Sequence, residues 1–143
     1  MQTLPARFAV RAARIKMKIV VLDGDVINPG DISWAPLEKL GEVAIYGDTP
    51  EDLIVERAAG AEVLVTNKVP LRAEAIKVLP QLKLICIAAT GMNNVDLEAA
   101  AERGIEVRNA VGYSTHAVTE TTIGAAIALL RQSIYYDLSL IHI

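Results

Sequence analysis

Five short apolar segments alternate with five segments of helical pattern along the 143 residues, and this alternation predicts an α/β fold. The fourth apolar segment, 83–88, has no alternation of polar and apolar residues, as expected for a strand covered on both faces. The connections between the segments are of ordinary length. These three observations predict a flavodoxin-like, doubly wound parallel sheet of five strands, followed by a long helix.

The strands are predicted from runs of β-branched and other apolar residues that end at turn-forming residues. The first run, Lys18-Ile-Val-Val-Leu22, ends at Asp23-Gly24-Asp25, and the second run ends at Gly47-Asp48. The third and fourth runs have the same character, and the fourth is the most apolar of all. The five strands are expected at 18–22, 43–46, 62–66, 83–88 and 105–108.

Each strand is followed by a helix whose ends are marked by capping and stopping residues. Ser33 is expected to cap the first helix, and Thr49 or Asp48 the second. Asn94 or Asp96 is expected to cap the fourth. The last helix has apolar residues at helical spacing. The predicted helices are 33–40, 50–59, 72–79, 97–103 and 115 to about 132.

The composition excludes several classes of protein. With 52% hydrophobic residues and a net charge of −3, the chain does not have the composition of a disordered protein. The longest uncharged apolar run, 124–130, is far shorter than the about 18–20 residues of a membrane span. The single cysteine, Cys86, excludes a disulfide scaffold, and a pI of about 5.4 disfavours general nucleic-acid binding. We therefore expect a soluble, cytosol-compatible domain with no membrane or nucleic-acid partner.

Charge and pattern divide the chain into four segments. The first 18 residues include several basic residues and no acidic one, although the whole chain has 14 basic and 17 acidic residues. We expect 1–16 to be a disordered basic extension, because Met17-Lys18 opens an ordinary strand. Residues 17–114 are expected to form one domain and 115–132 a helix that leaves it. Residues 133–143 form a tail, for which a non-native origin is one interpretation.

The loop after the fourth strand is the first candidate site, because ligands of open parallel sheets bind beyond the carboxyl ends of strands. Ala88-Ala89-Thr90-Gly91 has small side chains that let a ligand approach the backbone, and Gly91 can adopt conformations closed to other residues. Free backbone N–H groups near a helix start favour an anion such as a carboxylate. In the alternative interpretation, this loop is a structural turn in which Asn93 and Asn94 are only caps.

The loop after the third strand is the second candidate. Asn67 and Lys68 would present an amide and a cation beside the first loop if the third and fourth strands are neighbours. Together the two loops predict a site for a small hydroxylated acid. The alternative for Lys68 is a solvated surface lysine, the commoner environment of this residue type.

Other kinds of site have weaker support. Asp23-Gly-Asp25 is similar to the start of a Mg²⁺-dependent phosphatase of the haloacid dehalogenase type, but Ile27 stands where that motif has Thr or Val. Ser114 is better explained as a helix cap than as a nucleophile, and His116 as a structural or rim residue than as a base. Two histidines and one cysteine predict no metal site. No two of the nine glycines are two residues apart, so the chain has no Gly-x-Gly-x-x-Gly dinucleotide fingerprint.

Two longer strings carry a family resemblance, Ala88-Ala-Thr-Gly-Met-Asn-Asn-Val-Asp96 with its continuation to 108, and Asn109-Ala-Val-Gly-Tyr-Ser-Thr115. With them, the chain from 17 to about 132 resembles the first, substrate-binding domain of the D-isomer-specific 2-hydroxyacid dehydrogenases. The strings Leu22-Asp-Gly, Asn28-Pro-Gly-Asp and Thr66-Asn-Lys-Val69 are most similar to glycerate dehydrogenases, also called hydroxypyruvate reductases. Several motifs in order make the resemblance specific.

The resemblance implies two doubly wound domains with the active site in the cleft between them. It implies that backbone amides of Thr90-Gly91-Met92 hold the substrate carboxylate and that Asn67 and Lys68 lie on the substrate side. It also implies that Thr90 and Val118 border the nicotinamide of NAD or NADP. The helix 115–132 would cross into a coenzyme domain with the glycine fingerprint and the catalytic Arg, Glu and His. No catalytic residue is therefore expected in these 143 residues, and 138–143 match nothing expected after this helix.

The implied activity is NAD(P)-dependent reduction of hydroxypyruvate or glyoxylate to glycerate or glycolate, in the cytoplasm, by a protein that is a homodimer at full length. We expect the 143-residue chain alone to be inactive, because half of the cleft is expected to lie outside it. The alternative is a stand-alone small-acid-binding or regulatory module of flavodoxin-like fold. An exposed apolar stripe on the last helix is expected to favour self-association. It consists of Ile123, Ile127, Leu130 and Ile134.

Overall fold

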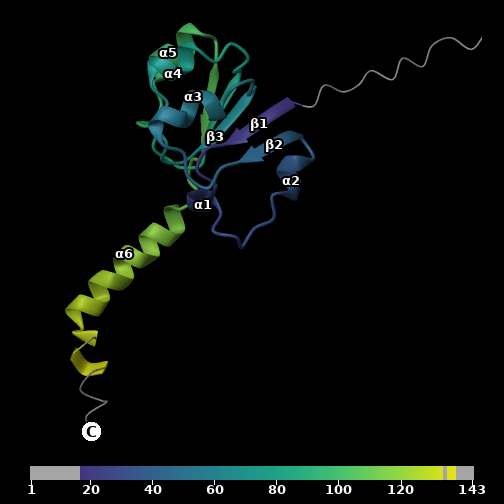
Figure 1. Ribbon diagram of the computed structural model, residues 1–143. Helices are drawn as coiled ribbons and strands as arrows, with labels where there is room; N and C mark the ends of the chain where they lie inside the picture. The colour runs from purple at the N-terminus through teal and green to yellow at the C-terminus, as the bar shows by residue number, and fades with distance from the viewer. Residues whose placement is uncertain (1–16, 134, 138–143) are drawn as a thin grey trace, which may run out of the picture.

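A computed structural model describes residues 17–133 and 135–137, so the expected basic extension and the last six residues lie outside the described part of the chain. Five parallel strands form one sheet in the order β2-β1-β3-β4-β5 (Figure 1). This is the strand order of flavodoxin, which confirms the predicted fold class. The strands are β1 (Met17–Val21), β2 (Gly41–Ile45), β3 (Val63–Thr66), β4 (Leu84–Ile87) and β5 (Glu106–Asn109).

The helices are shorter than the pattern predicts. The segment expected as a helix over 33–40 is a single turn, and the segment 50–59 begins with a 3₁₀ turn. Asp96 caps α5 as expected, because its carboxylate accepts a 2.9 Å hydrogen bond from the N–H of Ala99. Thr49 does not cap: its buried hydroxyl donates to the carbonyl of Leu22, 2.5 Å away. The helices are α1 (Gly24–Ile27), α2 (Ala35–Glu38), η1 (Glu51–Leu53), α3 (Ile54–Arg57), α4 (Ala73–Lys77), α5 (Leu97–Glu102) and α6 (Thr115–Leu130).

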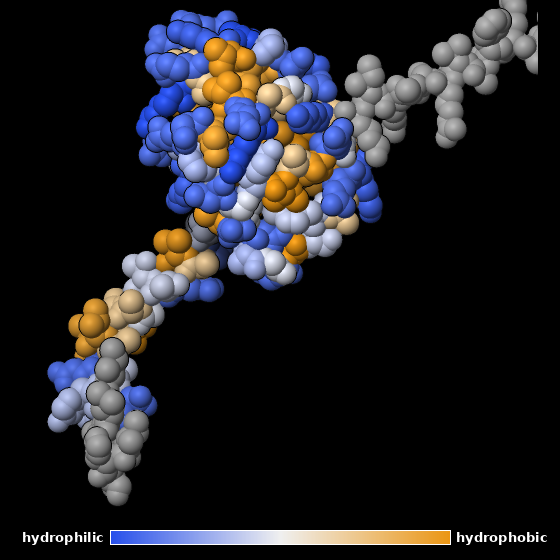
Figure 2. Space-filling model, in the orientation of Figure 1, coloured by the Kyte–Doolittle hydropathy of each residue, from blue (hydrophilic) through white to orange (hydrophobic). Residues whose placement is uncertain are grey.

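Helix α6 extends away from the sheet and none of its residues is buried (Figure 1). Figure 2 shows hydrophobic residues along this helix, clear of the globular part. The expected stripe is exposed, with Ile123 at 55%, Ile127 at 54% and Leu130 at 84%, whereas Ile134 lies outside the described residues. The apolar residues are spread around the helix and not confined to one face. Within the described residues, no helix is long and apolar enough to cross a membrane.

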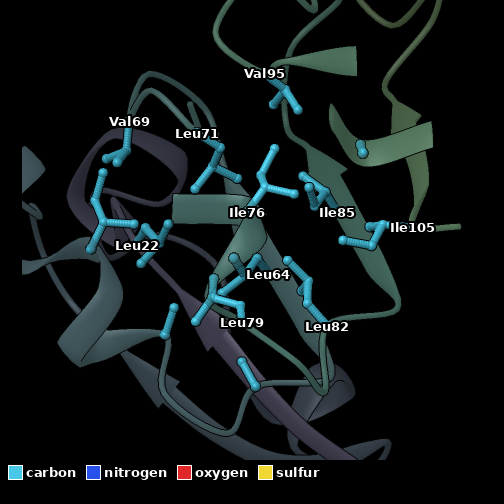
Figure 3. Packing of buried hydrophobic residues seen from close by; sticks show 14 of the residues in the cluster. Leu22, Leu64, Val69, Leu71, Ile76, Leu79, Leu82, Ile85, Val95 and Ile105 are labelled. Atoms are coloured by element: carbon cyan, nitrogen blue, oxygen red, sulfur yellow. The ribbon is translucent and has the colours of Figure 1, made fainter. Parts of the chain in front are cut away.

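The hydrophobic core lies between the sheet and the three helices α3, α4 and α5 (Figure 3). Leu64 and Ile85 from the central strands and Ile76 from α4 are fully buried there. Burying such a side chain contributes about 1.5–3 kcal/mol relative to leaving it exposed. This packing fixes the central strands, and with them the loops that leave their carboxyl ends.

The opposite face of the sheet is less covered at β4 and β5. Ile85 and Ile87 are buried, but Leu84 and Cys86, which point the other way, are only half-buried. On the neighbouring strand β5, Glu106 and Arg108 are exposed. The expectation that the fourth strand is covered on both faces is therefore wrong for the described residues. The sequence of a short apolar strand does not reveal whether one or both faces of the sheet are covered there. Apolar side chains also occur on partly exposed faces of a sheet.

Candidate functional site

Strands β3 and β4 are neighbours, with Thr66 paired to Ile87 at their carboxyl ends. The loop that follows β3 therefore lies beside the loop that follows β4, as the prediction for Asn67 and Lys68 required. A backbone bridge between Leu71 and Val95 joins the two loops further on. Both candidate loops thus meet at one edge of the sheet.

The turn after β3 is bound to a buried carboxylate. Asp23, which follows β1, is only 1% exposed. The N–H of Asn67 donates to both of its oxygens at 2.9 Å, the N–H of Lys68 donates to Oδ2 at 2.5 Å, and the N–H of Val69 donates to Oδ2 at 3.3 Å. Three consecutive N–H groups that converge on one anion form a backbone nest. The nest of this turn is filled by the protein's own carboxylate.

The side chain of Asn94 bonds to the carbonyl groups of the same turn. Its Nδ2 donates to the carbonyl oxygens of Asn67 and Val69, at 3.3 Å each. The hydroxyl of Thr66 also donates to the carbonyl of Val69, at 3.1 Å. The backbone of the turn is therefore bonded through its N–H groups to one loop and through its carbonyls to another.

The loop Thr90–Met92 has a different hydrogen-bond pattern. Its anchors are the carbonyl of Thr90, which accepts from Nδ2 of Asn109 at 2.7 Å, and the hydroxyl of Thr90, which donates to the carbonyl of Ala110 at 3.2 Å. None of the N–H groups of Thr90, Gly91 and Met92 donates to another part of the described chain, 17–133 and 135–137. Thr90 and Gly91 are exposed. The loop therefore presents free backbone donors in a fixed position.

A cavity of about 190 Å³ lies between the two loops. This is smaller than the pockets of about 300–1,000 Å³ that hold drug-sized ligands, so its size suits a small molecule. Lys68 is the one charged residue among those that line it. The lining residues are Asn67, Lys68, Ala89, Gly91, Asn93 and Asn94.

Asn67, a residue of this cavity wall, has one side-chain atom without a partner among the described residues. The side-chain Oδ1 of Asn67 is buried and accepts no hydrogen bond in the described structure. Such orphaned groups are rare in folded proteins, and a bound water or ion is one way in which their bonding is completed. The polar groups around this cavity are thus incompletely satisfied by the protein itself.

The residues predicted for the site fall into three groups. Asn67, Lys68 and Gly91 line the common cavity. Thr90 and Met92 belong to the loop beside it, where Met92 is half-buried against the core. Val118 is not brought to this cavity: it is 59% exposed on α6 and lines a separate groove of about 270 Å³ with its helix neighbours.

One expectation about Gly91 is wrong. Its φ lies outside the left-handed region, which in this chain is adopted by glycines elsewhere, such as Gly104 and Gly112. A Cβ at Gly91 would lie 3.1 Å from Oδ1 of Asn93. Space beside the cavity, and not a special backbone conformation, is therefore what Gly91 provides.

The prediction from sequence missed Asn93 and Asn94 as wall residues and Asp23 as the anchor of the turn. The two asparagines were interpreted as possible caps, but the cap of α5 is Asp96. Their position beside Gly91 in a loop after a buried strand was the available signal. The role of Asp23 has no local signal, because its partners lie 44 to 46 residues away.

The other sites considered are not supported by the geometry. Asp23 cannot act as a phosphatase nucleophile because both carboxylate oxygens are buried and bonded to backbone N–H groups. Ser114 makes no side-chain capping bond, contrary to expectation, and His116 is exposed at the start of α6. Burial, and then the charge of Glu106, raise the pKa of the Cys86 thiol, which keeps it protonated and unreactive near neutral pH. Among the described residues there is no group of three potential metal ligands.

Comparison with known proteins finds matches to one family of enzymes. Residues 19–136 match the family model described as "D-isomer specific 2-hydroxyacid dehydrogenase, catalytic domain". A hydroxypyruvate reductase of Blautia hydrogenotrophica is 40% identical over 119 residues, which are 81% of this chain and 36% of that protein. A glycerate dehydrogenase of Methylorubrum extorquens is 49% identical over 88 residues, 62% of this chain and 28% of that protein. The chain thus spans about a third of the length of these relatives.

Solved structures show the same architecture. The NAD⁺-bound 3-phosphoglycerate dehydrogenase of Entamoeba histolytica superposes with a TM-score of 0.65 at 29% identity, over 79% of this chain and 39% of that one. The NAD-dependent formate dehydrogenase of Staphylococcus aureus, in complex with NAD, has a TM-score of 0.66 at 28% identity, over 83% and 38%. Residues 19–136 cover most of the chain, and the match confirms the resemblance found in the motifs. This chain therefore belongs to the D-isomer specific 2-hydroxyacid dehydrogenase family, and its residues 19–136 match the catalytic-domain model of that family.

Proposed function

We propose that this chain is the substrate-binding part of an NAD(P)-dependent oxidoreductase that acts on the CH–OH group of small 2-hydroxy acids. Hydroxypyruvate and glyoxylate are the proposed substrates for reduction. The observation that carries this proposal is the set of free N–H groups at Thr90, Gly91 and Met92 beside a small cavity with a lysine in its wall. The names of the relatives, hydroxypyruvate reductase and glycerate dehydrogenase, point to the same substrates.

The proposed binding mode follows from the charges and donors at the cavity. A carboxylate accepts hydrogen bonds from backbone N–H groups, and charge-assisted bonds of this kind are about twice as strong as neutral ones. The N–H groups of 90–92 would hold the carboxylate, and the ammonium of Lys68 would add a favourable charge at the rim. Asn67 also lines this cavity, although its unpartnered Oδ1 is itself buried. This set of groups suits a small anion better than a neutral sugar, and the names of the relatives favour a 2-hydroxy acid among such anions.

The coenzyme is proposed to make only part of its contacts with these residues. Exposed Val118, in an apolar groove with Ala117, fits the edge of a nicotinamide ring, and Thr90 would border the same ring. The nicotinamide supplies or accepts the hydride when it is bound. The nine glycines include no phosphate-binding fingerprint, so we propose that the pyrophosphate is held outside these 143 residues. Whether NAD or NADP is preferred would be decided there.

Two further proposals concern the cell and the assembly. We propose a cytoplasmic location, supported by a single cysteine, which forms no disulfide within the described chain. We propose a homodimer for the full-length protein. The exposed apolar residues of α6 support an interface of some kind there, because contiguous exposed apolar residues mark interaction surfaces.

The test is calorimetric titration of the purified 143-residue chain with D-glycerate and with glyoxylate, without coenzyme. We expect saturable binding of both acids, weakened by Lys68→Met. As a matched control, Lys77→Met removes an exposed lysine on α4, away from the cavity, and should bind as the unaltered chain does. Acetate, which has the carboxylate without the second oxygen, should bind more weakly than either acid.

Two results would count against the proposal. Binding of inorganic phosphate in preference to glycerate would point to a phosphate site. Equal loss of affinity in Lys68→Met and Lys77→Met would remove Lys68 from the site. We also expect no NADH oxidation with hydroxypyruvate by this chain alone, and measurable turnover would refute that part.

A further inference from the structure

We infer that Asp23 is a positioning residue for the acid-binding cavity, because it fixes the turn Asn67–Val69 and thereby the place of Lys68. The inference rests on the proposed function for the identity of the ligand. The anchoring itself rests only on the bonds between Asp23 and the turn. Asp23 does not reach the ligand in this account and is not a catalytic residue.

The bonding of the Asp23 carboxylate singles it out from the other acidic residues. It is 1% exposed and takes hydrogen bonds from three consecutive N–H groups, at 2.5 to 3.3 Å. A buried carboxylate needs such partners, because an unpaired buried charge is strongly unfavourable. Hydrogen bonds to an ionised group are also among the stronger ones in proteins. The turn and the carboxylate therefore hold each other in place.

The bonds on the opposite side make the position of the turn unique. Asn94 donates to the carbonyls of Asn67 and Val69, and Asn94 itself lines the cavity. With N–H groups bonded to Asp23 and carbonyls bonded to Asn94, the peptide planes of the turn have little freedom to rotate. The side chain of Lys68 leaves this fixed backbone and is exposed. A fixed starting point reduces the loss of conformational freedom when Lys68 meets an anion.

The arrangement also explains why this nest does not bind the substrate. Its three N–H groups converge on Asp23, so an external carboxylate would have to displace a buried charge of the same sign. The N–H groups without a partner in the described chain are those of Thr90–Met92, in the loop on the other side of the cavity, of which Gly91 lines it. The N–H groups of one turn are thus bonded to an internal carboxylate, whereas those of the other loop are left for an external anion.

The first test is amide hydrogen exchange, followed by NMR on the unaltered chain and two variants. In the unaltered chain, the N–H groups of Asn67, Lys68 and Val69 should exchange about tenfold or more slowly than those of Thr90–Met92. In Asp23→Asn, the three turn amides should exchange about tenfold faster, while the amides of β1 and β3 keep their protection. Asp25→Asn, an exposed carboxylate two residues further on, is the matched control and should leave the turn unchanged.

The second test is a double-mutant cycle on D-glycerate affinity with Asp23→Asn and Lys68→Met. If Asp23 acts through Lys68, each single variant should weaken binding about threefold to tenfold, and the double variant should be no weaker than the worse single one. Additive losses would mean that Asp23 does not act through Lys68, and would overturn that part of the inference. This non-additivity is a readout that a merely structural role would not produce.

The exchange test decides whether Asp23 anchors the turn Asn67–Val69. Equal exchange of 67–69 and 90–92 in the unaltered chain would overturn it, even if Asp23→Asn does not fold. Faster exchange throughout β1 and β3 in Asp23→Asn would mean a general structural role and would also overturn it. If the unaltered chain binds no glycerate, the proposed function fails, and the exchange of 67–69 still decides whether Asp23 anchors the turn.

Discussion

The turns after β3 and β4 are adjacent in the sheet but use their backbone N–H groups in opposite ways. The N–H groups of Asn67, Lys68 and Val69 are bonded to the buried carboxylate of Asp23. Those of Thr90, Gly91 and Met92 have no partner within the described residues. The first turn is a fixed wall with a lysine, and the second has unbonded donors beside the cavity. What a polar loop at a strand end can bind therefore depends on its side chains and also on whether its backbone N–H groups already have acceptors within the protein.

The largest expected effect is on stability, from Asp23→Ala. The variant leaves three N–H groups of the first turn without their acceptor, so the free energy of unfolding should fall by about 3 kcal/mol. Urea denaturation followed by circular dichroism measures this. Asp25→Ala, the exposed control, should change it by less than about 0.5 kcal/mol. A loss of the same size in both variants would contradict the account of the first turn.

The next effect is on binding, from Gly91→Ala in the second turn. The added Cβ would lie 3.1 Å from Oδ1 of Asn93, at the wall of the cavity, while the φ of Gly91 tolerates alanine. We expect about a tenfold weaker binding of D-glycerate, or about 1.4 kcal/mol, with little change in stability. Calorimetric titration measures the affinity.

Gly104→Ala is the matched control for this change. Gly104 has φ +66° and open space around its missing Cβ. Alanine in this conformation should lower the stability by about 1 kcal/mol without altering the affinity for glycerate. If Gly91→Ala instead lowered stability and left binding intact, Gly91 would be a structural residue of the turn.

A smaller effect is expected from Lys68→Met. The side chain is exposed, so the variant should keep its stability within about 0.5 kcal/mol. Its affinity for glycerate should fall about threefold to tenfold, and the remaining binding should depend less on salt, because a charge at the rim is screened. Titrations at low and high ionic strength measure both. An unchanged salt dependence would show that Lys68 is not near the bound acid.

The smallest effect concerns a partly exposed carboxylate, which contrasts with Asp23. A side-chain hydrogen bond from Lys83 to Glu62, 2.6 Å long, lowers the pKa of Glu62 below 4.5. The charged form is thus favoured in the folded state, so this pair stabilises above pH 4.5, and the gain is lost as the pH falls through the lowered pKa. The free energy of unfolding of Glu62→Gln, measured from pH 3 to 7, should differ from that of the unaltered chain only above about pH 4.5. The difference should be slight, since a surface pair with an exposed lysine contributes little.

Much of the fold could be predicted from sequence because its signals are local. The strand runs and the cap by Asp96 are each decided within a few residues, and the five-stranded parallel sheet follows from the alternation of strands and helices. Coverage of β4 could not be predicted, because it depends on which side of the sheet the helices occupy. The apolar residues of α6 were foreseen as exposed, but their spread around the helix was missed.

The candidate site was predictable in its loops and not in its bonding. Asn67, Lys68 and Gly91 were found because polar and small residues follow neighbouring buried strands. The anchoring of the turn by Asp23 depends on a contact across 44 residues, which no local pattern contains. The placement of Val118 was drawn from family resemblance alone, and it lies on α6 and not at this cavity.

The most direct measurement of the central claim is a titration of the ¹⁵N-labelled chain with D-glycerate, followed through its amide resonances. We expect saturable shifts at Thr90, Gly91 and Met92, because their N–H groups gain a carboxylate partner, with much smaller changes at Asn67, Lys68 and Val69. Shifts confined to the turn Asn67–Val69 or to another surface, with the resonances of 90–92 unmoved at saturation, would contradict it.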